Sequence, residues 1–454
     1  MYRTISECRI CHNPQLVEVL DLGVQALTGV FPKSRAQPVT AGPLKLVKCV
    51  GEGDVCGLLQ LQQTYDLGEL YGDNYGYRSG LNASMVEHLH RKVRRILDRV
   101  RLPDDALIVD IGANDSTTLQ AYPAQGCTLV GVDPTAKKFS EFYPAHIQLI
   151  PEFFSAATLQ RHFPGRKATV ITSFSMFYDL EAPLTFMKEV AQVLDEEGLW
   201  ILEQSYMPTM LRRNSYDTVC HEHLEYYALE QIKWMTDRLD LKIVDVEFND
   251  INGGSFSLMV AKRGSAHVAS ASVEQILADE TRAGLHTLRP FQEFARSVAA
   301  SRATLRAFLD EAKQFGKSIC VLGASTKGNV LLQYCNVTSS DVARVGEVNP
   351  DKFEAFTPGT LLPIVSEQEV LAMQPDYLLV LPWHFRDFFL EHERFVDRNL
   401  VFPLPQLEIV RMTGLRDAGS DAGGIPREPG SKATVTRASG LEAKQASAPR
   451  ARVH

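Results

Sequence analysis

The chain has 454 residues, of which 45% are hydrophobic and 22% charged, and its formal net charge at pH 7 is -8. This length is typical of about three domains and this composition of a globular protein. The acidic charge offers no broad basic surface, so we expect no nucleic-acid binding. The sequence has no long apolar run, and its N-terminus, MYRTISECRICHNPQ, does not have the pattern of a secretory signal. We therefore predict a cytoplasmic protein without a membrane span.

Residues 1–75 consist of short apolar runs broken by glycine, proline and cysteine pairs. So little apolar sequence folds stably only with a cross-link or a metal. The four cysteines of this stretch are Cys8, Cys11, Cys49 and Cys56, spaced as C-x2-C and C-x6-C. Four thiolates suit a tetrahedral structural Zn²⁺, so we predict a zinc-binding domain, in which His12 could replace one cysteine. The alternative is four buried cysteines without a metal.

Residues 76–262 alternate between helical and strand patterns. The spacing of apolar residues in ASMVEHLHRKVRRIL predicts a helix, and the runs ALIVDIGA, CTLVGVD, ATVITSFSM and GLWILEQSYM predict buried strands. A helical region to about residue 315 is followed by the strand patterns KSICVLGAS, VARVGEVN and DYLLVLPW. Such alternation predicts mostly parallel sheets with helices on both faces, first over 76–262 and again over 263–414. Residues 415–454 are rich in Gly, Ala, Ser, Pro and charge, and we predict a disordered tail.

The turn after ALIVDI is typical of a cofactor site. Its glycine lets the backbone approach a ligand closely, and the helix that follows offers free N–H groups. An acid at the end of the neighbouring strand, Asp133, is placed to bind two ribose hydroxyls. The turn is not G-x-G-x-x-G, which favours S-adenosylmethionine over a dinucleotide; ordinary strand-to-helix turns remain the alternative. The predicted cofactor-binding residues are Asp110, Gly112, Asn114, Asp115, Asp133 and Ser173.

The segment CHEHLEYY, which begins at Cys220, is a candidate acid/base site. His221 and His223 are two residues apart, so they do not match the i, i+4 pair that binds catalytic zinc on a helix. On an extended segment they point to opposite sides, and one of them faces the cofactor loops. An imidazole steered by the carboxylate of Glu222 is a suitable general base. The alternative is a polar helix N-terminus without a catalytic role.

The segment LGASTKGN predicts a nucleotide anchor in the C-terminal domain. It places Ser325, Lys327 and Asn329 at a helix start, where phosphates bind well, and Lys327 would offset the charge of a diphosphate. Glu347 and Asn349 follow the next predicted strand and could meet a ribose or a base. The alternative is a stabilising domain without a ligand.

Several motifs together resemble those of the three-domain sugar C-methyltransferases, enzymes that make branched deoxysugars. They are the N-terminal C-x2-C pair and the segments CGLLQL, YGYRSGLN, VDIGANDSTTL, ILEQSYM, YDTVCHEHLEYY, NGGSF, VLGASTKGNVLLQYC, VGEVNPDKFEAFTPGTLLPIVS and DYLLVLPWHF. The resemblance implies an α/β protein with a small zinc-bearing N-terminal domain, a central Rossmann-like class I methyltransferase domain and a second Rossmann-like domain that helps bind a nucleotide-sugar. The disordered tail lies outside it.

The resemblance also implies a substrate and a mechanism. The substrate is a nucleotide-diphosphate 4-keto-deoxysugar, because an unactivated C3–H is too weakly acidic for an imidazole to remove. His223, with Glu222 beside it, is the expected base, and Tyr77 and His221 are expected to stabilise the enolate whose C3 attacks the methyl group of S-adenosylmethionine. The residues expected to reach the sugar are Tyr75, Tyr77, Arg78 and Asn82.

The chain departs from the family pattern at three places. Ser116 stands where the cofactor loop often has glycine, the second cysteine pair has a longer spacer than C-x2-C, and Cys220 stands where many relatives carry a tyrosine that contributes to the site.

Three other functions are the alternatives. A sugar O- or N-methyltransferase could use the same cofactor site. An NAD-dependent sugar-nucleotide dehydrogenase or epimerase is disfavoured by the missing glycine motif, and a scaffold without activity leaves the acid/base cluster unexplained.

Overall fold

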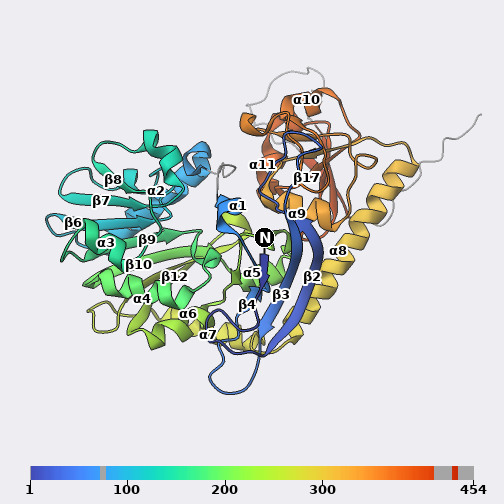
Figure 1. The fold of residues 1–454 in the computed structure, drawn as a ribbon. Helices are drawn as coiled ribbons and strands as arrows, with labels where there is room; N and C mark the ends of the chain where they lie inside the picture. Colours follow the sequence, from blue (N-terminus) through green and yellow to red (C-terminus); the bar gives the residue numbers. More distant parts are fainter. Residues whose placement is uncertain (1, 72–77, 414–431, 438–454) are drawn as a thin grey trace, which may run out of the picture.

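The computed structural model describes residues 2–71, 78–413 and 432–437. Its strands form two sheets of seven strands, one of four and one of two. Figure 1 shows the two large sheets in separate units, with the N-terminal strands β2 and β3 beside them. Among the described residues, no helix is long and apolar enough to cross a membrane.

The N-terminal unit is a four-stranded antiparallel sheet with the strand order β11-β4-β3-β2. Its strands are β2 (Leu16–Ala26), β3 (Ala41–Cys49), β4 (Leu59–Leu61) and β11 (Glu225–Tyr226), and beside them lie the pair β1 (Tyr2–Thr4) and β5 (Gln63–Tyr65) and the helix α1 (Leu67–Tyr71). The strand β11 comes from the distant segment that directly follows the two predicted catalytic histidines. The N-terminal sheet therefore includes part of the candidate active-site segment, which the sequence analysis did not predict.

The central unit is a seven-stranded sheet with the order β12-β13-β10-β9-β6-β7-β8. Its strands are β6 (Ala106–Ile111), β7 (Cys127–Val132), β8 (Ile147–Ile150), β9 (Ala168–Phe174), β10 (Leu194–Ser205), β12 (Leu241–Asn249) and β13 (Ser255–Lys262). Strand β13 runs antiparallel to both of its neighbours, β10 and β12, and the other adjacent strands are parallel. The chain order reverses between β6 and β9, and in open α/β sheets ligands bind at the carboxyl ends of strands at such a point. The helices of this unit are α2 (Ala83–Leu97), α3 (Ala156–His162), α4 (Pro183–Val193), α5 (Met207–Arg212) and α6 (Leu229–Arg238).

The C-terminal unit repeats this arrangement, with the strand order β16-β15-β14-β17-β18-β19-β20 and a reversal between β14 and β17. Its strands are β14 (Ile319–Leu322), β15 (Val345–Glu347), β16 (Ile364–Ser366), β17 (Tyr377–Val380), β18 (Asn399–Phe402), β19 (Glu408–Thr413) and β20 (Lys432–Arg437), and its helices are α9 (Thr326–Tyr334), α10 (Glu367–Ala372) and α11 (Arg386–Glu391). The predicted α/β class is thus confirmed. Strand β20 lies within the stretch predicted to be disordered, and there the expectation was wrong because Lys432–Arg437 pairs along β19.

Two helices, α7 (Ala271–Arg282) and α8 (Arg289–Gln314), connect the central and C-terminal units. Figure 1 shows the long helix α8 running beside β2 and β3 of the N-terminal unit. The ammonium group of Lys48 on β3, which is fully buried, lies 4.6 Å from the ring centroid of Phe291 on α8. Because α8 also leads into the C-terminal sheet, it holds the N-terminal and C-terminal units together.

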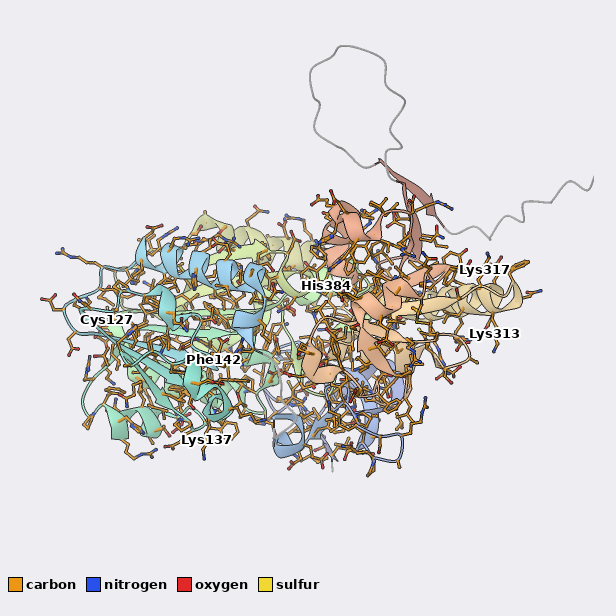
Figure 2. The ribbon with its side chains drawn as sticks, turned by 90° about the horizontal axis from the view of Figure 1, so that it is seen from above. Cys127, Lys137, Phe142, Lys313, Lys317 and His384 are labelled. Atoms are coloured by element: carbon orange, nitrogen blue, oxygen red, sulfur yellow. The ribbon has the colours of Figure 1, made fainter. Side chains whose placement is uncertain are left out.

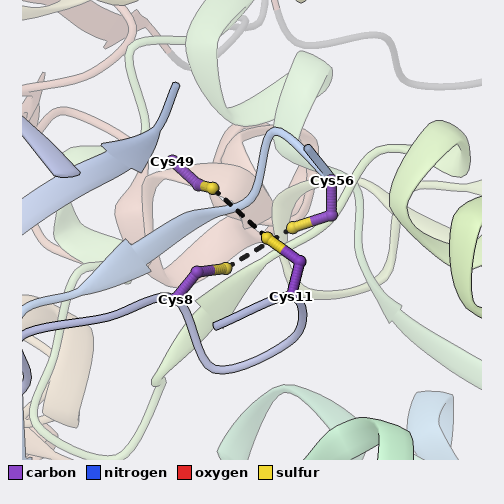
Figure 3. A group of neighbouring side chains, drawn as sticks. All are labelled: Cys8, Cys11, Cys49 and Cys56. Atoms are coloured by element: carbon purple, nitrogen blue, oxygen red, sulfur yellow. Dashed lines mark hydrogen bonds between the residues drawn. The ribbon is translucent and has the colours of Figure 1, made fainter. Parts of the chain in front are cut away.

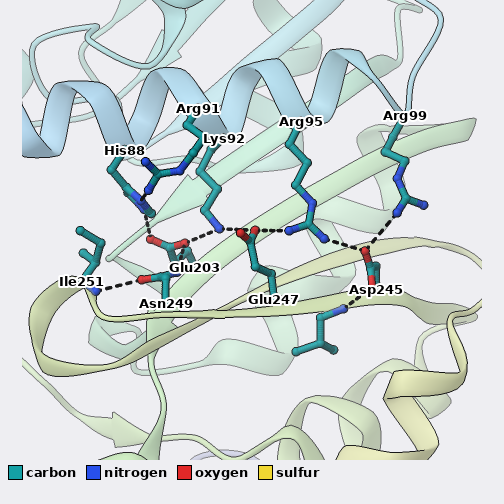
Figure 4. A network of polar contacts seen from close by, with 11 residues as sticks. His88, Arg91, Lys92, Arg95, Arg99, Glu203, Asp245, Glu247, Asn249 and Ile251 are labelled. Atoms are coloured by element: carbon teal, nitrogen blue, oxygen red, sulfur yellow. Dashed lines mark hydrogen bonds and ion pairs between the residues drawn. The ribbon is translucent and has the colours of Figure 1, made fainter.

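A chain of ion pairs fastens α2 to the central sheet (Figure 4). The carboxylate of Glu203 on β10 bonds to the imidazole of His88 at 2.5 Å and pairs with the ammonium of Lys92 at 2.9 Å. All three side chains are buried. Burial alone would raise the pKa of Glu203, but the bond from His88 and the charge of Lys92 outweigh it and hold that pKa below its ordinary value.

Replacing Lys92 with methionine should therefore destabilise the protein. The substitution leaves the buried carboxylate of Glu203 short of a counter-charge, so we expect the free energy of unfolding at pH 7 to fall by about 3 kcal/mol in urea titrations. Because the folded-state pKa of Glu203 is lowered, the loss should shrink as the pH drops below 4.5 and through the folded-state pKa.

The control is Lys233→Met, which removes a surface i, i+4 pair with Asp237. It should cost less than about 0.5 kcal/mol. Equal losses in the two variants would contradict a stabilising role for the buried network.

Candidate active site

Four cysteines of the N-terminal unit converge on one point (Figure 3). The sulfur atoms of Cys8 and Cys56 lie 3.4 Å apart, those of Cys11 and Cys49 lie 3.5 Å apart, and all four lie within 4.8 Å of one another. Four sulfurs around a tetrahedral zinc at about 2.3 Å from each would be separated by about 3.8 Å. The donor set and its spacing therefore fit a structural Zn²⁺, and the long C-x6-C spacer reaches the site because β3 ends at Cys49. The four predicted ligands are brought together, whereas the ring of His12 points to Glu7 instead.

Replacing Cys11 with serine should abolish binding of a stoichiometric zinc ion, because the site loses one of its four thiolates. Elemental analysis should show the loss, and the unfolding temperature should fall by several degrees because zinc binding stabilises the fold. Cys127→Ser is the matched control, since Cys127 lies on β7 outside the cluster. Full zinc content in Cys11→Ser would refute the assignment of this ligand.

The loop after β6 passes through the left-handed backbone region three times, at Gly112 (φ 75°), Asn114 (φ 50°) and Ser116 (φ 65°). Glycine adopts this region without strain, and asparagine tolerates it better than other residues. The departure at Ser116 therefore falls where the backbone favours glycine. Its hydroxyl donates to the carbonyl of Phe142 at 3.0 Å, which helps to hold the strained residue.

The carboxylate of Asp133 lies at the end of β7, beside this loop. One oxygen accepts from the backbone N–H of Asn114 at 2.8 Å, and the other accepts from the N–H and hydroxyl of Thr135, each at 2.7 Å. The acid and the loop thus meet at the carboxyl ends of adjacent parallel strands, as the sequence predicted for a ribose-binding acid.

Three other predicted cofactor residues are engaged within the protein. Asp110 is buried and accepts from the hydroxyl of Thr172, and its burial raises its pKa to about 7. Ser173 is fully buried and accepts from the indole N–H of Trp200 at 2.9 Å. Asp115 accepts from the N–H of Gly80 at 2.8 Å.

Two of the residues expected to reach the sugar can be located. The guanidinium of Arg78 stacks on the ring of Phe142 at 4.0 Å, with Nε 3.7 Å from the carboxylate of Asp115. Asn82 caps α2 by accepting from the N–H of Ser84. The other two residues, Tyr75 and Tyr77, lie outside the described residues.

His223 lies between the central and N-terminal units and is partly exposed. Its ring packs on Tyr178, which follows β9, at a centroid distance of 4.5 Å. Its Nδ1 lies 2.9 Å from the carbonyl of Thr218, which fixes the tautomer with a proton on Nδ1 and leaves Nε2 as the basic atom. Burial, together with the positive charge of Lys327, lowers the pKa of His223 to about 4, so the imidazole is neutral at pH 7.

A narrow cavity adjoins His223 near the ends of β9 and β10. The residues that line it are Tyr178, Ser205, Met207, Met210, Thr218, His223, Glu225 and Tyr226. The cavity therefore lies between His223 and the carboxyl ends of β9 and β10, and no described residue of the cofactor loop lines it.

His221 and Glu222 point away from this cavity. His221 is fully buried, packs edge-on against Tyr65 of the N-terminal unit at 4.6 Å, and faces backbone groups of Gln25 and Gly42 in the same unit. Its position is that of a packing residue at the junction, not of a donor to an enolate. Glu222 is partly exposed, and burial raises its pKa, an effect that the thiol of Cys220 partly offsets.

The loop after β14 repeats the arrangement of the cofactor loop. The carboxylate of Glu347, at the end of the neighbouring strand β15, accepts from the N–H of Ala324 at 2.8 Å and from the N–H of Asn349 at 3.0 Å. Ser325 caps α9 by accepting from the N–H of Gly328. Such a pairing of loop and acid is the arrangement that nucleotide-binding α/β units use.

Two of the predicted phosphate ligands bridge the units. Asn329 donates to the carbonyl of Thr28 in the N-terminal unit at 2.8 Å, and Lys327 donates to the carbonyl of Asn252 in the central unit at 2.8 Å. Lys327 is only partly exposed, and burial lowers its pKa.

Two residues that the sequence analysis did not assign lie beside Lys327. Asp217 accepts from the indole N–H of Trp383 at 2.9 Å across the two units. His384 follows Trp383 and sits where the central and C-terminal units meet (Figure 2). Burial and the charge of Lys327 lower the pKa of His384 to about 3. The segment PWHF contains Trp383 and His384. It was the sequence feature from which their place at the site could have been predicted.

Three family models match the chain in succession. They describe a zinc binding domain over residues 8–71, a methyltransferase domain over 85–246 and a C-methyltransferase C-terminal domain over 250–405. A curated relative, the C-methyltransferase NovU of Streptomyces niveus, is 27% identical over 417 residues, which are 90% of this chain and 97% of that protein.

The chain thus contains, in succession over residues 8–405, the zinc binding, methyltransferase and C-methyltransferase C-terminal domains that these models describe. This confirms the family suggested by the motifs and the expectation of an S-adenosylmethionine-dependent methyltransferase. S-adenosylmethionine is its cofactor and Zn²⁺ its structural metal.

Solved structures resemble part of the chain at low scores. N-methyltransferase NodS from Bradyrhizobium japonicum in complex with S-adenosyl-L-homocysteine is 13% identical, with a TM-score of 0.30. The match covers 40% of this chain and 88% of the NodS chain. The plantazolicin methyltransferase BpumL with the same ligand is 13% identical, covers 39% and 83%, and has a TM-score of 0.31. At these scores the similarity carries no functional inference.

Replacing Asp133 with alanine should weaken binding of S-adenosylmethionine by about tenfold or more, because the carboxylate that is expected to bond the ribose hydroxyls is lost. Titration calorimetry measures the change. Asp387→Ala, which removes a carboxylate of 89% exposure in the C-terminal unit, is the control and should bind normally. An unchanged dissociation constant in Asp133→Ala would exclude the ribose role.

Proposed function

We propose that the protein methylates C3 of a nucleotide-diphosphate 4-keto-deoxyhexose through an enolate, in the synthesis of a branched sugar. The observation that best supports this reaction is the state of His223, a neutral imidazole that lines a cavity near the carboxyl ends of β9 and β10 and whose Nε2 has no hydrogen-bond partner among the described residues. The unprotonated imidazole is the form that can accept a proton from carbon. The matches to the C-methyltransferase C-terminal domain and to NovU support the C-methyl transfer.

In this proposal Nε2 of His223 takes the C3 proton, while the bond from Nδ1 to the carbonyl of Thr218 holds the ring and accommodates the imidazolium that forms. S-adenosylmethionine, when bound, supplies an electrophilic methyl group on its sulfonium. The loop at Gly112 and the carboxylate of Asp133 orient it from the ends of β6 and β7. The reaction is then mainly a problem of alignment between two bound reactants.

The nucleotide end of the substrate fits the C-terminal unit. Ser325 and Lys327 lie at the start of α9, which attracts phosphate, and Glu347 and Asn349 end the neighbouring strand. Lys327 is also the cation that acts on His223. We propose that residues 1–75, 76–262 and 263–414 act as zinc-binding, methyltransferase and nucleotide-sugar-binding domains, respectively.

The function is tested by incubating the protein with S-adenosylmethionine and a panel of TDP- and GDP-linked 4-keto-6-deoxyhexoses. We expect one member to gain a methyl group by mass spectrometry, with a carbon-bound methyl singlet in its proton spectrum. A methyl group with an oxygen- or nitrogen-bound shift would favour the sugar O- or N-methyltransferase. No gain with any member would mean a substrate outside this class.

Replacing His223 with asparagine should lower turnover by at least about a hundredfold, because the general base is lost. Binding of S-adenosylmethionine and of the sugar nucleotide should be nearly retained in calorimetric titrations. The control is His286→Asn, at an exposed position between α7 and α8. Full turnover in His223→Asn would exclude the base assignment.

A further inference from the structure

A glycine of the N-terminal unit lies directly against Glu222. A Cβ atom on Gly29 would stand 2.7 Å from Oε1 of Glu222 and 3.6 Å from Oγ1 of Thr326. Carbon and oxygen atoms that are not bonded do not approach to 2.7 Å, so any larger residue at position 29 must displace the carboxylate or the loop. Glycine is required at position 29 for lack of space and not for backbone conformation, because the backbone of Gly29 does not lie in the left-handed region. All three units thus meet within a few ångströms.

The backbone of the loop that contains Gly29 cannot easily move away from Glu222, because hydrogen bonds to the C-terminal unit hold it before and after Gly29. Before it, the amide of Gln333 exchanges two hydrogen bonds with the backbone of Ala26, at 2.8 and 3.1 Å. Within it, the carbonyl of Thr28 accepts from Asn329 at 2.8 Å. After it, the carbonyl of Pro32 accepts from the N–H of Phe356 at 2.9 Å.

The backbone next to Glu222 is equally fixed. The N–H of Leu224 donates to the carbonyl of Tyr178 at 2.9 Å, and the carbonyl of Leu224 accepts from the N–H of Leu61 at 2.8 Å. Strand β11 then pairs with β4. The carboxylate is therefore the part that a larger residue at position 29 would move.

Glu222 also has unused hydrogen-bonding capacity. Its Oε2 is buried without a well-formed hydrogen bond from the described residues, although the thiol of Cys220 and the backbone N–H of Glu222 act on the carboxylate. A buried polar oxygen without a well-formed hydrogen bond is costly, and in a native protein it indicates a strained or functional site. Gly29 and Glu222 are both partly exposed, as are Thr326 and Lys327, so this side of the junction is open to a ligand.

We propose that Gly29 is a positioning residue for the reaction: the loop Leu27–Val30 of the zinc-binding unit forms a wall of the substrate site and holds the Glu222 carboxylate toward a polar group of the sugar. This inference rests on the proposed function, because it concerns the same site. It also gives the zinc centre an indirect role in catalysis. The metal would hold the end of β3 next to the start of β4, and β4 pairs with β11, the strand that follows Glu222 in the chain.

The test compares Gly29→Ala with Gly264→Ala. Gly264 is exposed, a Cβ there meets nothing within 4 Å, and its backbone is not in the left-handed region. We expect Gly29→Ala to lower kcat by about tenfold or more, as misplacement of a catalytic-site group does, with unchanged zinc content and unchanged affinity for S-adenosylmethionine. Gly264→Ala should match the wild-type protein. Wild-type kcat in Gly29→Ala would overturn the proposal.

A second substitution separates the contact from a general loss of structure. Glu222→Asp shortens the side chain by one methylene and makes room for the new methyl group. We expect the double variant to be more active than the two single effects multiplied together. Effects that simply multiply would overturn the proposal. Should Gly29→Ala fail to fold, a folded double variant would support the contact and an unfolded one would overturn it.

The unfolding temperatures of the wild-type protein, the two single variants and the double variant form a mutant cycle that can be measured without a sugar. Gly29→Ala should unfold a few degrees lower than the wild-type protein, and Glu222→Asp should restore part of the loss. Inactivity of the wild-type protein toward every sugar would refute the proposed function alone, and the unfolding cycle would still decide whether Gly29 and Glu222 are coupled. Equal unfolding temperatures for Gly29→Ala and Gly264→Ala would overturn the proposed contact.

Discussion

The candidate active site depends on one short pairing, that of β11 with β4. Two residues of the central unit, Glu225 and Tyr226, complete the sheet of the N-terminal unit. The residue that follows them, Tyr227, bonds to the central unit: its carbonyl accepts from the N–H of Met207 at the start of α5. The segment that contains His223 is thus held by the N-terminal sheet through β4 and by the central unit through the start of α5. Without a stable N-terminal sheet it would be a loop, and a loop cannot hold a base to within the fraction of an ångström that catalysis requires.

This constraint explains why a small unit with few apolar residues carries a metal. Two pairs of cysteines hold the turn before Asn13 and the loop between β3 and β4 at one point. Zinc binding can contribute stability that a core of this size does not provide. The zinc centre itself stands apart from the chemistry, and its effect reaches His223 through β4 and β11.

The electrostatics of the junction favour a neutral base. His223 and His384 both have lowered pKa values, from burial first and then from the charge of Lys327. Among the described residues, Asp217 is the acid that can balance the charge of Lys327. Burial raises the pKa of Asp217, and the charge of Lys327 offsets part of that rise. A weakly basic imidazole is available at neutral pH without first losing a proton. Its low basicity must be offset by alignment with the substrate and by stabilisation of the enolate.

Much of this architecture could be predicted from the sequence, because it depends on local patterns. The zinc ligands follow from cysteine spacing, α2 from its apolar periodicity, and the cofactor loop from a strand, a glycine and an acid. The contacts that join the units could not be predicted in this way. The pairing of β11 with β4, the approach of Gly29 to Glu222 and the bond from Asn329 to Thr28 link residues far apart in the chain.

Residue type also left the direction of several side chains open. His221 and His223 are chemically alike, yet one packs on Tyr65 and the other on Tyr178. Lys327 and Asn329 carry groups that suit phosphate, and in the structure they also bind backbone carbonyls of other units. Strand β20 forms because residues that lack an apolar core of their own can still extend an existing sheet edge.

The central claim is that His223 removes a proton from carbon before the methyl group is transferred. The most direct measurement is exchange of the C3 hydrogen of the ketosugar with heavy water, followed by proton NMR without S-adenosylmethionine. We predict exchange catalysed by the wild-type protein and its loss in His223→Asn. Exchange at the wild-type rate in that variant, or no exchange with the wild-type protein on a ketosugar that it methylates, would contradict the account.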